Sequence, residues 1–148
     1  MDERFRLQRF VDAQHPVYAT VLSELRSCRK RSHWMWFIFP QVAGLGRSVT
    51  SQTFAVTSLA EAAAYVAHPT LGPRLRECAA LVAGIEGRSI DEIFGHPDDL
   101  KFHSSMTLFA RAAPGEPIFG ACLQKYFGGR PDPQTLALVS RIVENGAD

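Results

Sequence analysis

The sequence lacks the short motifs that mark the common enzyme and metal-binding families. It contains no P-loop, no GxSxG nucleophile elbow, no HExxH zinc motif and no CxxC pair. Two histidines at metal-binding spacing on one predicted helix are also missing, so we expect no metal and no other cofactor. Its 3 cysteines lie far apart, which fits neither a disulfide framework nor a zinc site and favours reduced thiols in a cytoplasmic protein.

Long hydrophobic runs and an excess of one charge are lacking as well. The longest wholly apolar run covers residues 34–39, whereas a helix that spans a bilayer needs about 20 residues. The first ten residues are charged throughout, so we expect no signal peptide and no membrane contact. With 16 Lys and Arg against 15 Asp and Glu, the net charge of +1 argues against a dedicated polyanion binder but leaves room for local basic patches.

Hydrophobic spacing and capping residues predict helices along most of the chain, and no hairpin signal is present. We therefore predict an all-α protein, a compact array of about seven to eight short helices. A single domain would cover residues 1–148, with an ordered core from about 3 to 144. Residues 47–57 are weakly patterned and receive no assignment. The predicted helices cover about 3–13, 16–28, 58–67, 73–85, 89–95, 99–111, 117–127 and 132–144.

Capping signals support several of these helix starts. Ser58 and Ser89 each open a capping box with a glutamate three residues later. Pro73 and Pro117 suit the first turns of their helices. Either aspartate of the pair at 98–99 can cap the helix that follows.

Residues 29–41 differ most from ordinary helix or loop composition. Three cations precede an apolar run that holds both tryptophans, and Pro40 ends the run. Six continuous apolar residues fit either a buried strand or a turn of buried helix. In a strand, Trp34 and Trp36 would share one face and could stack a base or sugar, whereas in a helix they would diverge. We favour a place in the core for both rings.

A second stretch, residues 98–105, gathers two carboxylates, a lysine, a histidine and two hydroxyls. Such a segment could supply an acid/base pair or a contact for an anion. Helix capping by an aspartate and a polar outer helix face account for the same residues more simply.

Four segments of the chain together resemble one protein family. They read RKRSHWMWFIFPQVAGLGRS, AYVAHPTLGPRLREC, IFGHPDDLKFHSSMTLFA and KYFGGRPDPQTL. They resemble the bacterial domain-of-unknown-function family 1810 over nearly the whole chain. The resemblance implies a compact all-helical array and no particular activity, because none is established for the family. Members sometimes carry the label calpastatin, but an inhibitor of that kind is disordered and repetitive, unlike this capped and patterned chain. The positions that match the family motifs are Arg29, Lys30, Ser32, His33, Trp34, Trp36, Phe39, Pro40, Gln41, Asp98, Asp99, Lys101, Ser104 and Ser105.

We predict that residues 29–41 meet residues 98–105 around a pocket for a small anionic metabolite with a ring, nucleotide-like in kind. Cations beside stacking surfaces are what nucleotides require. A catalytic version would be a metal-independent hydrolysis or transfer, with His33 paired to Asp98 or Asp99 at about 2.6–3.2 Å. The predicted ligand-binding residues are Arg29, Lys30, Ser32, Trp34, Trp36, Gln41, Lys101, Ser104 and Ser105.

Two other functions remain open at the level of the sequence. One is a non-catalytic binding module for single-stranded nucleic acid or a protein partner, which requires a continuous exposed stripe of cations beside exposed aromatic rings. In the other, the aromatic run is only core, and function lies on a different surface. The oligomeric state does not follow from the sequence.

Overall fold

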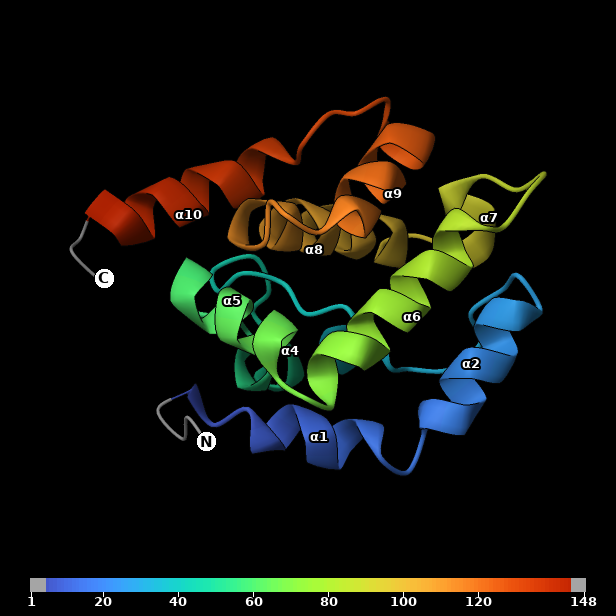
Figure 1. Ribbon diagram of the computed structural model, residues 1–148, viewed down its shortest axis with the longest axis horizontal. Helices are drawn as coiled ribbons and strands as arrows, with labels where there is room; N and C mark the ends of the chain where they lie inside the picture. The colour runs from blue at the N-terminus through green and yellow to red at the C-terminus, as the bar shows by residue number, and fades with distance from the viewer. Residues whose placement is uncertain (1–4, 145–148) are drawn as a thin grey trace.

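The computed structural model describes residues 5–144 of the chain. Within this range the chain forms ten helices, joined by loops, and no strand (Figure 1). The all-α fold is therefore confirmed, with slightly more helices than the predicted seven to eight. The predicted domain and ordered core also include residues outside the described part, at 1–4 and 145–148. In chain order the helices are α1 (Gln8–Gln14), α2 (Tyr18–Arg26), α3 (Met35–Ile38), α4 (Val49–Thr53), α5 (Leu59–Ala67), α6 (Leu71–Ala83), α7 (Ile90–Phe94), α8 (Asp98–Ala112), α9 (Pro117–Phe127) and α10 (Pro133–Glu144).

The two additional helices, α3 and α4, are each about one turn long. α3 is the centre of the aromatic run, so the run is helical and not extended. It buries Met35 and Ile38, which are three residues apart and therefore share a face. α4 lies in the segment that received no assignment, and the Ser48 side chain caps it by accepting a hydrogen bond from the Ser51 N–H at 3.1 Å. Helices this short carry too little periodicity to stand out in the sequence.

Local capping explains several helix starts, and the structure corrects the predictions for the starts of α6 and α8. Ser89 and Glu92 form the expected reciprocal capping box. Ser58 accepts from the Glu61 N–H, but the Glu61 carboxylate bonds the N–H of the residue before Ser58, so that box is incomplete. α6 begins two residues before Pro73. Neither aspartate caps α8, because its first turn already includes both of them.

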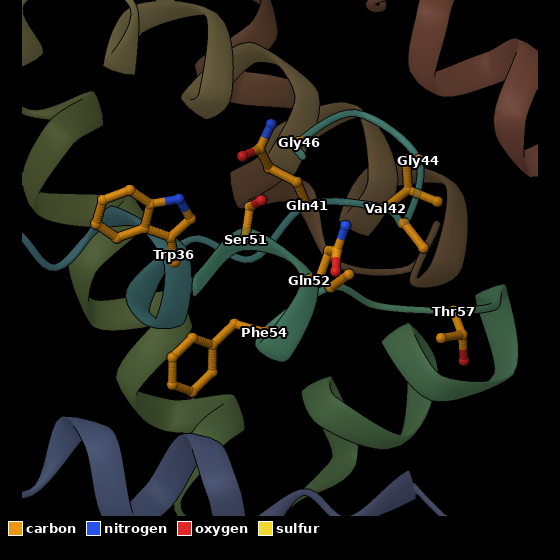
Figure 2. A pocket seen from close by; sticks show the side chains of 11 residues that line it. Trp36, Gln41, Val42, Gly44, Gly46, Ser51, Gln52, Phe54 and Thr57 are labelled. Atoms are coloured by element: carbon orange, nitrogen blue, oxygen red, sulfur yellow. The ribbon is translucent and has the colours of Figure 1, made fainter. Parts of the chain in front are cut away.

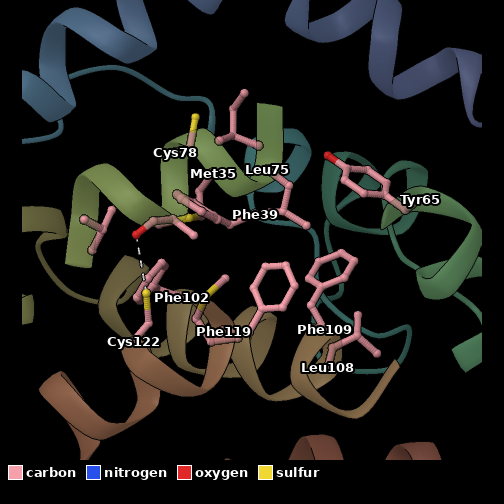
Figure 3. Close-up of a cluster of buried hydrophobic side chains, with 14 of the residues drawn as sticks. Met35, Phe39, Tyr65, Leu75, Cys78, Phe102, Leu108, Phe109, Phe119 and Cys122 are labelled. Atoms are coloured by element: carbon pink, nitrogen blue, oxygen red, sulfur yellow. Dashed lines mark hydrogen bonds between the residues drawn. The ribbon is translucent and has the colours of Figure 1, made fainter. Parts of the chain in front are cut away.

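The core is organised around α8, which packs against α3, α5, α7, α9 and α10. In Figure 1, α8 crosses the middle of the view, with α9 and α10 above it and α5 and α6 below. The predicted inner face of α8, at Phe102, Met106 and Phe109, is fully buried. Figure 3 shows these phenylalanines and Phe119 facing Phe39 across the core, and the Phe39 and Phe102 rings meet edge to face at 4.9 Å. Each fully buried side chain of this kind contributes about 1.5–3 kcal/mol of stabilisation.

Two polar side chains of α1 fix the segments that carry α3 and α4. Arg9 donates hydrogen bonds to the carbonyl of Thr53, the last residue of α4, at 2.8 Å, and to that of Ala55, just after α4, at 3.0 Å. The Gln14 amide is buried and donates to the carbonyl of Phe37, in α3, at 2.7 Å. Because both contacts join backbone groups far along the chain, α1 acts as a common anchor for the two short helices.

No helix in residues 5–144 is long and apolar enough to cross a membrane.

Candidate functional site

A buried carboxylate, Glu24 on α2, holds the loop that leads into the aromatic turn. It accepts hydrogen bonds from the backbone N–H groups of Arg31 and Ser32, at 2.8 and 3.1 Å, and from the Ser32 hydroxyl. It also accepts from the Trp34 indole N–H at 2.8 Å. Burial alone would raise the pKa of this carboxyl, but these hydrogen bonds together hold the pKa below its ordinary value. Ser32 and Trp34, both predicted to bind ligand, thus have structural partners.

Glu24 is not among the predicted site residues, although the sequence carries a signal for it. Glu24 lies three residues after Val21 and directly before Leu25, on the apolar face of α2, and is only 8% exposed. A charged residue on an apolar helix face needs polar partners. The four donors on the loop after α2 are those partners.

A cluster of two lysines and one aspartate joins the two predicted segments. The Lys30 Nζ lies 2.7 Å from one oxygen of the Asp98 carboxylate, and the Lys101 Nζ lies 3.3 Å from the other. The Lys30 backbone N–H also donates to the carbonyl of Ile93 at 2.8 Å. The predicted meeting of residues 29–41 with 98–105 is therefore observed at this point. Two ammonium groups on one carboxylate leave a net charge of +1 in the cluster.

The two lysines of the cluster also contact the two tryptophans. The Lys101 Nζ lies 4.5 Å from the centroid of the Trp36 ring, and the Lys30 Nζ lies 5.3 Å from that of Trp34. Both distances are within the range of cation–π attraction. Trp34 is 1% exposed, whereas Trp36 is only half-buried, so Trp36 is the ring available to a ligand.

A cavity of about 150 Å³ lies beside Trp36 (Figure 2). Figure 2 shows the rings of Trp36 and Phe54 bordering it, with the side chains of Gln41 and Ser51 between these rings and the glycine loop. A parallel bridge joins its two backbone walls, since the N–H of Val56 donates to the carbonyl of Gln41 at 2.9 Å. Further lining residues are Val42, Gly44, Gly46, Gln52 and Thr57.

Only Trp36 and Gln41 of the predicted ligand-binding residues line this cavity. The Gln41 side chain is half-buried and forms no hydrogen bond within the described part of the chain. The other walls come from residues 42–57, most of which belong to the segment left unassigned in the sequence. That segment contains no recognisable functional motif, because it lines the cavity mainly with backbone, glycine and small polar side chains.

The predicted catalytic residues do not form an acid/base pair. His33 is exposed and makes no hydrogen bond, ion pair or ring contact with any described residue. Asp98 is engaged by the two lysines, and Asp99 lies 3.0 Å from the imidazole Nδ1 of His96. A catalytic role for these three residues stays a prediction. Arg29 is also exposed, and with Arg88 it borders a separate hollow of about 380 Å³.

The later part of the second stretch turns away from the cavity. The Ser104 hydroxyl is buried and lies 2.6 Å from the hydroxyl of Thr135 on α10. His103 stacks on Phe127 at 3.9 Å, with its Nε2 2.7 Å from the carbonyl of Arg130. The Ser105 hydroxyl is fully buried and has no hydrogen-bond partner among the described residues. None of these side chains lines the cavity, so Ser104 and Ser105 remain predictions as ligand-binding residues.

No group of three or more His, Cys, Asp or Glu side chains that could hold a metal ion occurs within residues 5–140.

Within residues 5–144, ten short helices around one core define an all-helical protein, with a small cavity beside the cluster of two lysines and one aspartate. The family described as Protein of unknown function (DUF1810) matches residues 4–139, and the chain belongs to this family. The resemblance seen in the sequence is thereby confirmed.

The fold is also similar to a solved structure, that of the conserved hypothetical protein Rv1873 from Mycobacterium tuberculosis. The two chains share 57% sequence identity, and they superpose with a TM-score of 0.91 over 93% of this chain and 98% of that one. No curated protein matches the sequence.

Proposed function

We propose that this protein binds a small anionic metabolite with a ring, nucleotide-like in kind, with the ring at Trp36 and the anion at Lys101. One observation carries the proposal: Trp36 forms a wall of the cavity and also lies under the Lys101 ammonium. A stacking surface, a small cavity and a cation therefore adjoin one another. This combination suits a ligand that has a flat ring at one end and a phosphate or carboxylate at the other.

Lys101 is the better anion ligand of the two lysines. Lys30 makes the shorter contact to Asp98, and its side chain is 8% exposed against 23% for Lys101. An ammonium group has three N–H donors, so Lys101 keeps donors free after its single contact with the carboxylate. The cluster carries one positive charge more than the aspartate neutralises, which favours an incoming anion.

The alternative function, a module for single-stranded nucleic acid or a protein partner, has weaker support. It requires exposed aromatic rings beside exposed cations. Arg29 and Arg31 are exposed, but none of the aromatic side chains, all of which lie in the described residues, is exposed to the same degree. A small-molecule site beside the half-buried Trp36 ring therefore fits the surface better.

A hydrolase or transferase reaction would need more than the arrangement at hand. His33 would have to meet Asp98 or Asp99, and both carboxylates already contact other charged or titratable side chains. The proposal is therefore one of binding, and catalysis by these residues is an extension that needs a separate test.

A thermal-shift screen against nucleotides and phosphorylated metabolites tests the proposal. A ligand at 100 times its dissociation constant stabilises the folded protein by about 2.7 kcal/mol. We expect at least one such ligand to raise the melting temperature of the wild type, and Lys101→Ala and Trp36→Leu to abolish the shift.

Arg111→Ala is the matched control for the lysine substitution. It removes one positive charge from the opposite end of the same helix, at an exposed position away from the cavity. It should bind as the wild type does. Hits that survive both Lys101→Ala and Trp36→Leu, or a screen without hits, would contradict the proposal.

A further inference from the structure

We infer that the cavity selects a single six-membered ring of the pyrimidine type, read by the Gln41 amide, and that it excludes two-ring purines. This inference rests on the proposed function, because it names the ring that the Trp36 site would accept.

The size of the cavity supports one ring. Its volume is about 150 Å³. A protein cavity of about that volume holds a benzene molecule, whereas sites that enclose a drug-sized ligand measure roughly 300–1,000 Å³. A pyrimidine base is close to benzene in size, and a fused two-ring base is not. The sugar and phosphate of a nucleotide would therefore remain outside, on the side of Trp36 where Lys101 lies.

The two walls that set this size are packed to different degrees. The Phe54 ring lies 5.4 Å from the ring of Phe37 and 5.7 Å from that of Phe10, so it is packed into the core on its far side. On the opposite wall, a methyl group added at Gly46 would lie only 2.5 Å from the Cβ of Ser51. Phe54 therefore has packed side chains behind it, whereas α4 buries no residue and lies at the surface. Enlarging the cavity for a second ring on the Phe54 side would require displacing packed side chains.

The Gln41 amide is a polar group of the cavity that no described residue engages. Its backbone carbonyl is fixed by the N–H of Val56, and its side chain has no hydrogen-bond partner within residues 5–140. Gln52, by contrast, already donates from its amide to the carbonyl of Arg47 at 3.3 Å. The Gln41 amide atoms are open to solvent, so a ligand that bonds them replaces hydrogen bonds to water, with a net gain of about 0.5–1.5 kcal/mol for each bond.

A primary amide can donate and accept side by side, so it matches a ring edge that carries an acceptor next to a donor. Uracil and cytosine both present such an edge on a single ring. Benzene-like rings fit the same volume but would leave the amide of Gln41 unpaired. Shape and hydrogen bonding together therefore favour a pyrimidine base.

Calorimetric titration of the full chain with UMP, CMP, AMP and GMP tests the inference. We expect UMP or CMP to bind at least about tenfold more tightly than either purine nucleotide, a difference of about 1.4 kcal/mol. Equal or tighter binding of AMP or GMP would overturn the inference and leave the proposed function standing. If none of the four binds, the inference fails, and the wider thermal-shift screen decides the proposed function separately.

The role of Gln41 is tested with Gln41→Leu and the shorter amide Gln41→Asn. Gln41→Leu should weaken pyrimidine binding about tenfold, the effect of losing one or two hydrogen bonds. Gln41→Asn keeps the amide, should bind with intermediate affinity, and provides the test if the leucine variant does not fold. Gln124→Leu is the matched control on the exposed face of α9 and should leave affinity unchanged. Full affinity in both Gln41 variants would show that this amide does not read the ring.

Discussion

Among single residues, Glu24 and Asp98 are two carboxylates that differ in burial and in the groups that they bond. Glu24 is buried and bonds neutral donors, three of them on the backbone or indole of the loop at 31–34. Asp98 is partly exposed and bonds two ammonium groups. The first carboxylate therefore positions the aromatic turn, and the second joins that turn to α8 and sets the charge beside Trp36.

Replacing Glu24 by glutamine should destabilise the fold. The amide keeps one acceptor oxygen but places an NH₂ group against donors on the loop, which then lose their partner. Hydrogen bonds to charged groups contribute about 1.5–3 kcal/mol each, so we expect Glu24→Gln to lower the free energy of unfolding by about 1–3 kcal/mol in urea denaturation.

The control for this substitution is Glu86→Gln. The Glu86 side chain is 85% exposed and forms a surface ion pair with Lys125, and such pairs contribute little. The unfolding free energy of the Glu86→Gln variant should stay within about 0.5 kcal/mol of that of the wild type. Equal losses in the two variants would argue against a special role for Glu24.

The pH dependence of stability should report the same carboxylate. Burial opposes ionisation of Glu24, but its hydrogen bonds prevail and lower the pKa in the folded state. The unfolded chain therefore takes up a proton first, at a pKa of about 4.3. The stabilising contribution is complete above that pH and is lost as the pH falls through the folded-state pKa.

We accordingly expect the unfolding free energy of the wild type to fall more steeply than that of Glu24→Gln as the pH is lowered below about 4. Urea denaturation of both proteins between neutral and acid pH measures this. Parallel curves would mean that the Glu24 pKa is the same in the folded and unfolded chains.

At the scale of elements, α3 and α4 determine the site although they are among the shortest helices. Successive residues of a helix are about 100° apart, so residues two apart point in nearly opposite directions. This rotation sends Trp34 inward to Glu24 and leaves Trp36 beside Lys101 and the cavity. α4 then supplies the wall opposite Trp36, through Ser51 and its neighbour.

A pair of glycine substitutions tests how tightly α4 is packed. A Cβ at Gly46 would meet Ser51 at 2.5 Å, so Gly46→Ala should push α4 outward and destabilise the protein by about 1–3 kcal/mol. Gly120 lies inside α9 with open space around it, so Gly120→Ala should stabilise the protein by about 0.5–1 kcal/mol. Thermal or urea denaturation of both variants measures these opposite signs. A neutral Gly46→Ala would show that α4 shifts freely, and the cavity could then not act as a rigid size filter.

At the scale of the whole molecule, one hydrophobic cluster extends from Leu7 in front of α1 to Val139 in α10. Elements from both halves of the chain contribute to it, and α8 contacts five other helices. Since no part of the cluster belongs to one half alone, we expect the folded state to be lost as a unit.

Unfolding should therefore be a single cooperative transition, as for most domains of fewer than 150 residues. Urea curves followed by far-UV circular dichroism and by tryptophan fluorescence should have the same midpoint. The fluorescence reports on the turn at 34–36, whereas circular dichroism reports on all helices. Two separate midpoints would divide the chain into more than one folding unit.

The sequence by itself determined the elements that depend on local interactions. Periodic apolar residues and capping groups lie within a few positions of one another, so they predicted the long helices, the buried face of α8 at Phe102, and the capping box at Ser89. The composition of the two stretches supplied only a hypothesis that residues 29–41 meet 98–105, because no short-range pattern relates segments so far apart.

Only the tertiary structure decided which side chains form the site. Lys30 and Asp98 are 68 positions apart, and the cavity forms where Trp36 meets Phe54, a residue of the unassigned segment. Burial in the fold also committed Trp34 and Ser32 to Glu24 and left Gln41 free. These outcomes depend on how helices pack and on which polar groups lose water, and neither quantity is encoded in the spacing of neighbouring residues.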